Sequence, residues 1–389
     1  MIIELTEYQK KAIPRYKIDT QIIDRLKEKY KTQVKVDLKY TIDGDCWEFY
    51  AQGWVGYIPV TPDFGIRIKP KVPVRNLLGM LEYAYNLKSC YFLDNLVDCD
   101  SLEEFYNRLA EILTKKILKL TRQGLYKTYI PKTKSIGYVR GRLDLAKTIK
   151  TWNPKLTCNY KQQTPDIPEN QILLYTLYCI SRDRLCNPQI QKIVSKVYRD
   201  LGRSITLTPY TARDCLNIKY NRLNRQYQQL HQLCRFFLDR NMPSYNFGNY
   251  QTVPFLIDME KLFEKFVAEW LKVNLPPQYQ IKIKETIKLD PIKLEIDLLI
   301  CDRTTKKTCY VLDTKYKNPK KPSNQDIYQI TTYATNQNCD RTILIYPQAL
   351  TQPLNCDIGN INIRSLAFSL QNDLEAAGEI FLHNLIEAK

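Results

Sequence analysis

The residues whose types and spacing could do chemistry gather around Asp313-Thr314-Lys315, in the stretch YVLDTKYKNPKKP. Residues two positions apart on a strand point to the same face, so Asp313 and Lys315 can act together. They can form an ion pair at the end of a strand. They can also form half of a site in which a carboxylate binds a divalent cation and an ammonium orients water. The partners that the rest of the chain supplies decide between these interpretations.

A second acidic residue, Asp297, is expected to face Asp313 across a hairpin. The apolar stretch IKLEIDLLICD predicts a strand that turns back at a point centred on Thr305. Facing residues of an antiparallel pair have a constant index sum, which puts Asp297 opposite Asp313. The same register puts Glu295 opposite Lys315. Facing carboxylates repel unless a cation lies between them, so the pair predicts a Mg²⁺ site, which Mn²⁺ can also fill. If a bulge shifts the register, Glu295 is the alternative ligand.

Two predicted helices flank these strands and can supply further groups. In the earlier helix, KLFEKFVAEWL puts Glu264 on or beside an apolar stripe. Its alternative role is that of an exposed helix carboxylate. In the later helix, Gln329 and Tyr333 are four positions apart and therefore share a face. The alternative for this pair is an ordinary polar helix surface.

The charge balance favours a partner that is a polyanion. The chain has 58 Lys and Arg against 41 Asp and Glu, a net charge of +17, and such an excess supplies sequence-independent affinity for phosphate groups. Next to the candidate site, Lys317, Lys320 and Lys321 predict a phosphate track, with a solvated basic loop as the alternative. No apolar run approaches 18 residues, and the start MIIELTEYQK lacks the pattern of a signal peptide. We therefore expect a cytoplasmic, nucleic-acid-associated protein that makes no use of a membrane.

The composition also excludes several kinds of chemistry. The chain has 2 His and 12 Cys, and no pair of cysteines has Cys-x-x-Cys spacing. A structural zinc site is therefore not expected, and the cysteines are predicted to be reduced thiols. The scarcity of His argues against His-based acid–base catalysis. Any catalysis should use carboxylates, lysines and a bound metal.

At 389 residues the chain is expected to form several domains of a mixed α+β or α/β class. Residues 1–73 predict a β-rich N-terminal module, and residues 74–250 a mainly helical region with a basic, turn-rich insert near 126–168. A Gly- and Pro-containing stretch at 241–255 is the best internal boundary. Residues 251–389 then follow the order α-β-β-β-α-β, which predicts a compact α/β domain with a hairpin at its centre.

The candidate residues resemble the motifs of PD-(D/E)xK nucleases, in the RecB-like variant with a Gln-x-x-x-Tyr helix. In chain order they are Glu264, Asp297, Asp313-x-Lys315 and Gln329-x-x-x-Tyr333. The resemblance implies a restriction-endonuclease-like α/β domain in which Asp297 and Asp313 bind Mg²⁺, with Glu264 acting directly or through water. Lys315 would orient the nucleophile, and the Gln and Tyr would fix the site and the nucleic acid. Metal-assisted hydrolysis of a phosphodiester needs no His.

The front half resembles the McrC family, the nuclease subunits of McrBC-type 5-methylcytosine-dependent restriction systems. The stretches that carry this likeness are residues 56–87, 137–145 and 158–177. The resemblance implies a subunit of a prokaryotic antiviral defence system. Its partner would be a hexameric McrB-like AAA+ GTPase that itself reads modified cytosine in double-stranded DNA.

The resemblance further implies that the chain docks on the GTPase through its front portion, stimulates GTP hydrolysis and cuts the DNA. The sequence has no G-x-x-x-x-G-K-[ST], so the nucleotide site must lie on the partner. Arg67, Lys69 and Lys71 are candidates for the stimulating contact, with a solvated edge as the alternative.

Two other functions stay open at this point: a RecB-like repair nuclease that needs no GTPase, and a catalytically inert DNA-binding adaptor.

Overall fold

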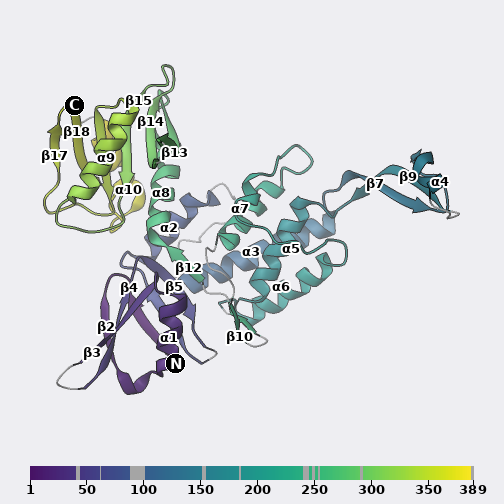
Figure 1. Ribbon diagram of the computed structural model, residues 1–389, viewed down its shortest axis with the longest axis horizontal. Coiled ribbons are helices and arrows are strands. Elements are labelled where there is room, and N and C mark those ends of the chain that lie inside the picture. Colours follow the sequence, from purple (N-terminus) through teal and green to yellow (C-terminus); the bar gives the residue numbers. More distant parts are fainter. Residues whose placement is uncertain are drawn as a thin grey trace. The chain divides into compact units, whose positions relative to one another are not determined.

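The computed structural model describes most of the chain, and Figure 1 shows its elements in order. The described residues are 1–40, 44–61, 63–87, 101–150, 155–183, 185–239, 245–247, 250–252, 255–289 and 292–386. The chain forms two compact units of mixed α and β structure. One comprises Met1–Phe105 with Met242–Lys389, and the other comprises Tyr106–Asn241. The division at Asn241 falls in the Gly- and Pro-containing stretch that the sequence singles out.

The N-terminal part of the first unit contains two small sheets and a helix. The first sheet has the order β2-β4-β3 and the second the order β1-β6-β5-β12. Their strands are β1 (Ile2–Thr6), β2 (Lys10–Pro14), β3 (Val34–Lys39), β4 (Cys46–Ala51), β5 (Trp54–Pro59), β6 (Gly65–Lys69) and β12 (Phe255–Asp258). Between them lie η1 (Arg15–Lys17) and α1 (Thr20–Lys29). Alternate residues of β4 are buried, as a strand with one face on a core requires. The β-rich character expected for residues 1–73 is present.

The second of these sheets is completed by β12, which comes from far along the chain. β12 pairs antiparallel with β5, and Leu256 lies opposite Gly56. Gly56 has φ +133°, and a Cβ at this position would collide with the carbonyl oxygen of Phe255. Only glycine fits here, because it tolerates both the backbone conformation and the close approach. The expected N-terminal module and the expected C-terminal domain are therefore joined in one unit.

The rest of the first unit is a six-stranded mixed sheet with the order β13-β14-β15-β16-β18-β17. Its elements begin with α8 (Met259–Asn274), β13 (Tyr279–Leu289), β14 (Ile292–Asp302), β15 (Thr308–Thr314), α9 (Asn324–Gln337) and β16 (Arg341–Tyr346). This is the α-β-β-β-α-β order that the sequence predicts, and the prediction is confirmed. β15 and β16 pair in parallel, with α9 between them in sequence.

The segment after residue 348 completes this sheet and its core. It contains β17 (Asn355–Ile358), β18 (Ile361–Ala367) and α10 (Leu374–Ile386), and β18 pairs in parallel with β16. The rings of Trp270, Phe368 and Phe381 form edge and tilted contacts with centroids 5.2–6.5 Å apart. Gly378 of α10 lies so close to the Trp270 indole that a Cβ would collide with it. The C-terminal helix is thus part of the fold that holds α8 in place.

Helix α2 (Val74–Ala84) also belongs to the first unit, where it packs against α8. The Asn76 side chain donates hydrogen bonds to the carbonyl oxygens of Leu370 (2.9 Å) and Asn372 (2.7 Å). Because Asn76 is 7% exposed, these bonds satisfy a buried polar group. The first unit also contains β10 (Tyr245–Phe247) and β11 (Tyr250–Thr252), which pair with each other.

The second unit combines a helical bundle with a strand extension. Its helical elements are most of α3 (Leu102–Gln123), α5 (Pro168–Ser181), α6 (Pro188–Leu201), η4 (Asp214–Leu216) and α7 (Tyr227–Leu238). In α7, buried His231 bonds to the Tyr220 hydroxyl (2.8 Å) and to the Glu169 carbonyl oxygen (2.9 Å). Burial lowers the pKa of His231 to about 4.

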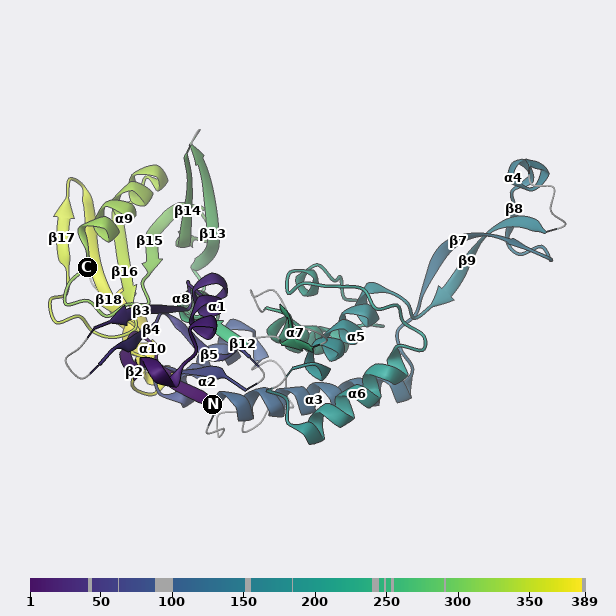
Figure 2. The same ribbon diagram turned by 60° about the horizontal axis from the view of Figure 1, so that its bottom comes forward.

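The insert expected to be basic and turn-rich forms strands instead. β7 (Thr128–Ile136) pairs with β9 (Leu156–Thr164) along its whole length, and β8 (Arg142–Leu143) adds to β9, with α4 (Leu145–Lys150) beside it. Figure 2 shows β7 and β9 running out from the helices of this unit. The central residues of β7 are all exposed. The strands therefore carry no alternating apolar pattern by which the sequence could reveal them.

The ten described cysteines are free thiols, as expected, and Cys90 and Cys99 lie outside the described residues. No helix among the described ranges is long and apolar enough to cross a membrane.

Candidate active site

The hairpin of β14 and β15 has the predicted register beside the candidate residues. The recorded pairs are Leu298 with Leu312, Leu299 with Val311, and Ile300 with Tyr310. All three have the index sum that would set Asp297 opposite Asp313 at the next step. A bulge does occur, between Ile300 and Cys301, but it lies on the turn side and leaves this register unchanged. Asp297 Oδ2 accepts hydrogen bonds from the Thr314 backbone N (3.1 Å) and hydroxyl (3.2 Å).

Asp313 lies near the end of β15 and is 1% exposed. Its Oδ2 forms an ion pair with the Lys315 ammonium at 2.7 Å. Burial raises the pKa of Asp313 to about 7; the Lys315 charge lowers it and the Asp297 charge raises it. A carboxyl whose pKa is shifted this far by burial and by nearby charges is typical of a functional site.

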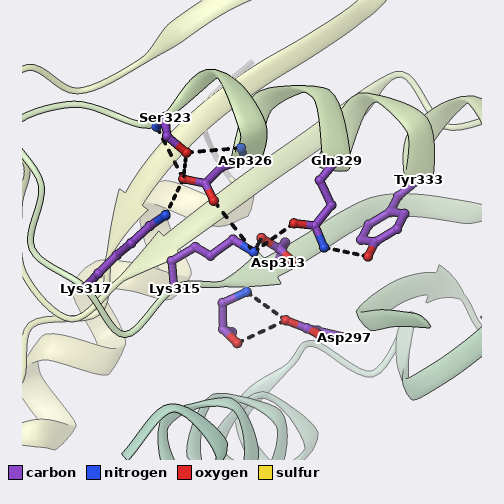
Figure 3. A network of polar contacts seen from close by, with 9 residues as sticks. Asp297, Asp313, Lys315, Lys317, Ser323, Asp326, Gln329 and Tyr333 are labelled. Atoms are coloured by element: carbon purple, nitrogen blue, oxygen red, sulfur yellow. Dashed lines mark hydrogen bonds and ion pairs between the residues drawn. The ribbon is translucent and has the colours of Figure 1, made fainter. Parts of the chain in front are cut away.

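Lys315 connects Asp313 to helix α9, as Figure 3 shows. Its ammonium donates to Gln329 Oε1 at 3.1 Å, and Gln329 Nε2 donates to the Tyr333 hydroxyl at 2.7 Å. Burial is the largest single influence on the pKa of Lys315 and lowers it, but the carboxylates of Asp313, Asp326 and Asp297 together raise this pKa above its usual value. The structure thus brings Asp313, Lys315, Gln329 and Tyr333 into one network.

A further member, Asp326, is missing from the sequence-based set. It is 5% exposed, and its Oδ2 accepts from the Lys317 ammonium (2.6 Å) and the Ser323 hydroxyl (2.6 Å). Its Oδ1 lies 3.9 Å from the Lys315 ammonium. Ser323 and Asp326 form a capping box at the start of α9. The spacing Ser-x-x-Asp before a helix is the signal that could have identified this residue.

Glu264 lies near Asp297 but is paired with a lysine that the sequence did not single out. Its Oε1 is 3.1 Å from the Lys284 ammonium, which is also 3.5 Å from Glu295 Oε1. Burial and the nearby Asp297 charge raise the pKa of Glu264. Lys284 has φ +54°, and the pairs of β13 with β14 on either side of it keep the same register. No sequence pattern announces this local backbone conformation.

The carboxylates at the site fit a Mg²⁺ ion that takes few ligands from the protein. Within the described ranges, no three His, Cys, Asp or Glu side chains converge as a ready metal cluster, so Glu264 is not gathered with Asp297 and Asp313. Mg²⁺ commonly takes one or two carboxylates and keeps several waters. Asp297 and Asp313 supply two such carboxylates, and the buried Asp313 Oδ2 already lies against a cation, the Lys315 ammonium.

The basic residues predicted to bind nucleic acid or partner have different surroundings. Lys317 is held by Asp326, whereas Lys320 and Lys321 are exposed. Arg67 is paired with Glu103 (2.9 Å) and Glu4, and Lys69 with Glu4 (2.7 Å). Lys71 lies over the rings of Tyr8 and Tyr316. Their roles toward DNA or a GTPase stay predictions.

Together, the fold and the site define a class: a multidomain α+β protein with an acidic, lysine-containing site at the end of a central strand of a mixed sheet. A family model, the McrBC 5-methylcytosine restriction system component, matches residues 50–347, and the chain belongs to this family. The resemblance inferred from the front-half segments is confirmed at this level.

Two relatives illustrate the likeness. The Type IV methyl-directed restriction enzyme EcoKMcrBC of Escherichia coli K12 is 25% identical over 312 residues, covering 73% of this chain and 88% of that protein. A chain in a half-complex from a tetradecameric assembly of Thermococcus gammatolerans McrB AAA+ hexamers with bound McrC has a TM-score of 0.58. It is 17% identical and covers 99% of this chain and 100% of its own length. At that identity the structural likeness concerns the fold.

Proposed function

We propose that this chain is the endonuclease subunit of a modification-dependent restriction system and hydrolyses DNA phosphodiesters with Mg²⁺. The observation that carries the proposal is the network at the end of β15. There the Lys315 ammonium lies 2.7 Å from Asp313 and 3.1 Å from Gln329, with Asp297 beside it. Family membership supports an enzyme of a restriction system. The PD-(D/E)xK assignment of this domain is part of the proposal.

The residues divide the chemical task between them. Asp297 and Asp313 would hold Mg²⁺, for which Mn²⁺ can substitute, and Glu264 would contribute through water. When bound, the metal polarises a phosphoryl oxygen and makes its water more acidic. The Lys315 ammonium orients the nucleophile and offsets charge that develops on the phosphate. Gln329 fixes that ammonium, and Tyr333 in turn fixes Gln329 through the 2.7 Å bond.

The proposed partner is a hexameric McrB-like AAA+ GTPase that reads modified cytosine in double-stranded DNA. The matched solved assembly contains McrB AAA+ hexamers with bound McrC, and the proposal extends this arrangement to the present chain. The net charge of +17 supports contact with DNA. We place the protein in the cytoplasm of a prokaryote, where antiviral defence meets incoming DNA.

The test combines the purified chain with a McrB-like GTPase from the same organism, GTP, Mg²⁺ and a methylated or unmethylated plasmid. We expect GTP-dependent cutting of the methylated plasmid that is lost with chelator, with Asp313→Asn and with Lys315→Met. Lys307→Met is the matched control, because it removes an exposed charge in the turn of the same hairpin. Full cutting by Asp313→Asn would show that the assigned site is wrong.

The same assay separates the alternatives. Cutting that needs no GTPase would favour a RecB-like repair nuclease. DNA binding without cutting, under all metal conditions, would favour an inert adaptor. GTP turnover by the partner is measured with and without this chain, and an unchanged turnover would contradict the proposed partnership while leaving the nuclease assignment in place.

A further inference from the structure

Tyr316, the residue that follows Lys315, connects the candidate site to the N-terminal module. Tyr316 is 2% exposed, and its hydroxyl donates to Glu7 Oε1 at 2.8 Å. Glu7 follows β1 directly and is 1% exposed, and its backbone N donates to the Lys69 carbonyl oxygen at 3.0 Å. A charged side chain buried this deeply is costly unless its partners are in place. The bond is therefore a specific joint rather than a chance surface contact.

Lys71 supplies the positive charge of this joint. Its backbone N donates to Glu7 Oε1 at 2.8 Å. Its ammonium lies 4.2 Å from the ring centroid of Tyr316 and 4.5 Å from that of Tyr8. Lys71 is half-buried, and a cation partly shielded from water against aromatic rings is held more strongly than a fully exposed one. Glu7 of the N-terminal module thus contacts the hydroxyl of Tyr316, and Lys71 contacts its ring.

On its other side Tyr316 borders the proposed catalytic groups. Its ring packs against Phe263, the residue before Glu264, with centroids 5.9 Å apart. β15 ends at Thr314, so Lys315 lies just beyond the strand. Its backbone N donates to the Ile345 carbonyl oxygen (2.8 Å), and its carbonyl oxygen accepts from the Lys317 N (2.8 Å). The next anchor along the chain is the Tyr316 side chain.

We propose that Tyr316 is a positioning residue for Lys315, and that Glu7 and Lys71 make the N-terminal module a structural part of the nuclease site. This inference rests on the proposed function, in which Lys315 acts in hydrolysis. When the Glu7–Tyr316 bond breaks, the chain after β15 loses its anchor, and the ammonium leaves its place beside Asp313 and Gln329. A displacement of about 1 Å in a catalytic group can cost about a hundredfold in rate. The joint also gives a partner bound to the N-terminal module a direct route to the site.

The test uses variants that change only this joint. Tyr316→Phe keeps the ring and removes the hydroxyl, Glu7→Leu removes the acceptor, and Glu7→Gln keeps an acceptor oxygen. We expect Tyr316→Phe and Glu7→Leu each to lower kcat at least about tenfold with the KM for DNA within about twofold. Glu7→Gln should retain most of the activity. The double variant Tyr316→Phe/Glu7→Leu should be no slower than the slower of the two single variants, because both changes remove the same hydrogen bond.

Tyr310→Phe is the matched control. Tyr310 lies in β15, is also 2% exposed, and its hydroxyl accepts a bond from Arg341 at 3.3 Å. It should cut like the wild type. Thermal melts show which variants are folded at the assay temperature, and Glu7→Leu tests the same bond if Tyr316→Phe does not fold. A folded Tyr316→Phe or Glu7→Leu with wild-type kcat would overturn the proposal.

Hydrogen exchange of the full chain gives a readout that does not depend on cutting. Tyr316→Phe should speed exchange at the amides of Lys315 and Lys317 several-fold and leave β16 unchanged. If the wild type does not cut DNA but exchange responds, the positioning holds and the proposed function fails. If Asp313→Asn abolishes cutting while Tyr316→Phe alters neither kcat nor exchange, the proposed function stands and the positioning role is wrong.

Discussion

Removal of the Lys315 ammonium should destabilise the metal-free protein by an amount that grows above about pH 7. Burial raises the pKa of Asp313 from its usual 3.8 to about 7, with Lys315 acting to lower it. Between these two values the folded protein keeps a proton that the unfolded chain has released. The contribution of Asp313 to stability therefore falls as pH rises from about 4 to about 7, and is constant above that in the wild type.

Lys315→Met takes away the charge that lowers the pKa of Asp313, so the proton stays on above pH 7. Each further pH unit at which the carboxyl is protonated only in the folded state costs about 1.4 kcal/mol. The variant should thus lose little from this source at pH 7, about 1.4 kcal/mol at pH 8 and about 3 kcal/mol at pH 9. Protonation keeps the loss below the roughly 3–5 kcal/mol expected for a broken buried pair whose remaining partner stays charged.

Urea unfolding in the presence of EDTA, at several pH values from 6 to 9, measures this difference. The double variant Lys315→Met/Asp313→Asn lacks the titrating carboxyl and should run parallel to the wild type above pH 7. Lys307→Met controls for the loss of a positive charge. The reasoning is refuted if Lys315→Met itself runs parallel to the wild type from pH 7 to 9, or if the double variant keeps the extra slope.

Three further predictions concern the fold that supports the site. Burial lowers the pKa of His231 from 6.5 to about 4. Its contribution to stability is therefore present above pH 6.5 and is lost, by up to about 3 kcal/mol, as pH falls to about 4. In urea melts the free energy of unfolding of His231→Gln should fall less steeply with pH than that of the wild type, and an equal fall would contradict this. Gly56→Ala should lower the free energy of unfolding by about 3 kcal/mol, because φ is +133° and the Phe255 carbonyl lies against the new Cβ. Gly359→Ala, which has open space around the new Cβ, should lower it by about 1 kcal/mol. Thermal melts compare the two variants, and equal losses would argue against the collision. Ser323→Ala removes the cap of α9 and should lower the free energy of unfolding by about 1 kcal/mol. An unchanged melting temperature would contradict this.

The sequence could predict the hairpin because its strands are adjacent in the chain and rich in buried apolar residues. Once the turn is placed, the register of β14 and β15 follows, and the recorded pairs agree with it. The bulge at Ile300 and Cys301 could not be foreseen, but it lies between the turn and the site and leaves the register at the site unchanged. The helix residues Gln329 and Tyr333 could be predicted because helical spacing alone puts them on one face.

Contacts between distant parts of the chain left no local signal. The four residues of β12 pair with β5, although nothing in their composition indicates which strand they would pair with. The bond between Glu7 and Tyr316 spans 309 positions and is of a kind that no spacing rule addresses. The strand β7 escaped for a different reason, since its largely exposed side chains give no apolar period.

The site shows why the acidic residues could be found while most of their counterions could not. Three buried or half-buried carboxylates each lie against a lysine: Asp313 with Lys315, Asp326 with Lys317, and Glu264 with Lys284. Without such partners, carboxylates this close would be protonated rather than charged. Lys315 was found because it lies two positions from its partner, whereas Lys284 reaches Glu264 from β13, an element that no spacing rule connects to α8. Part of the lysine excess that the sequence assigns to DNA therefore serves inside the protein, where it lowers the pKa values of Asp313, Asp326 and Glu264 and so opposes their protonation.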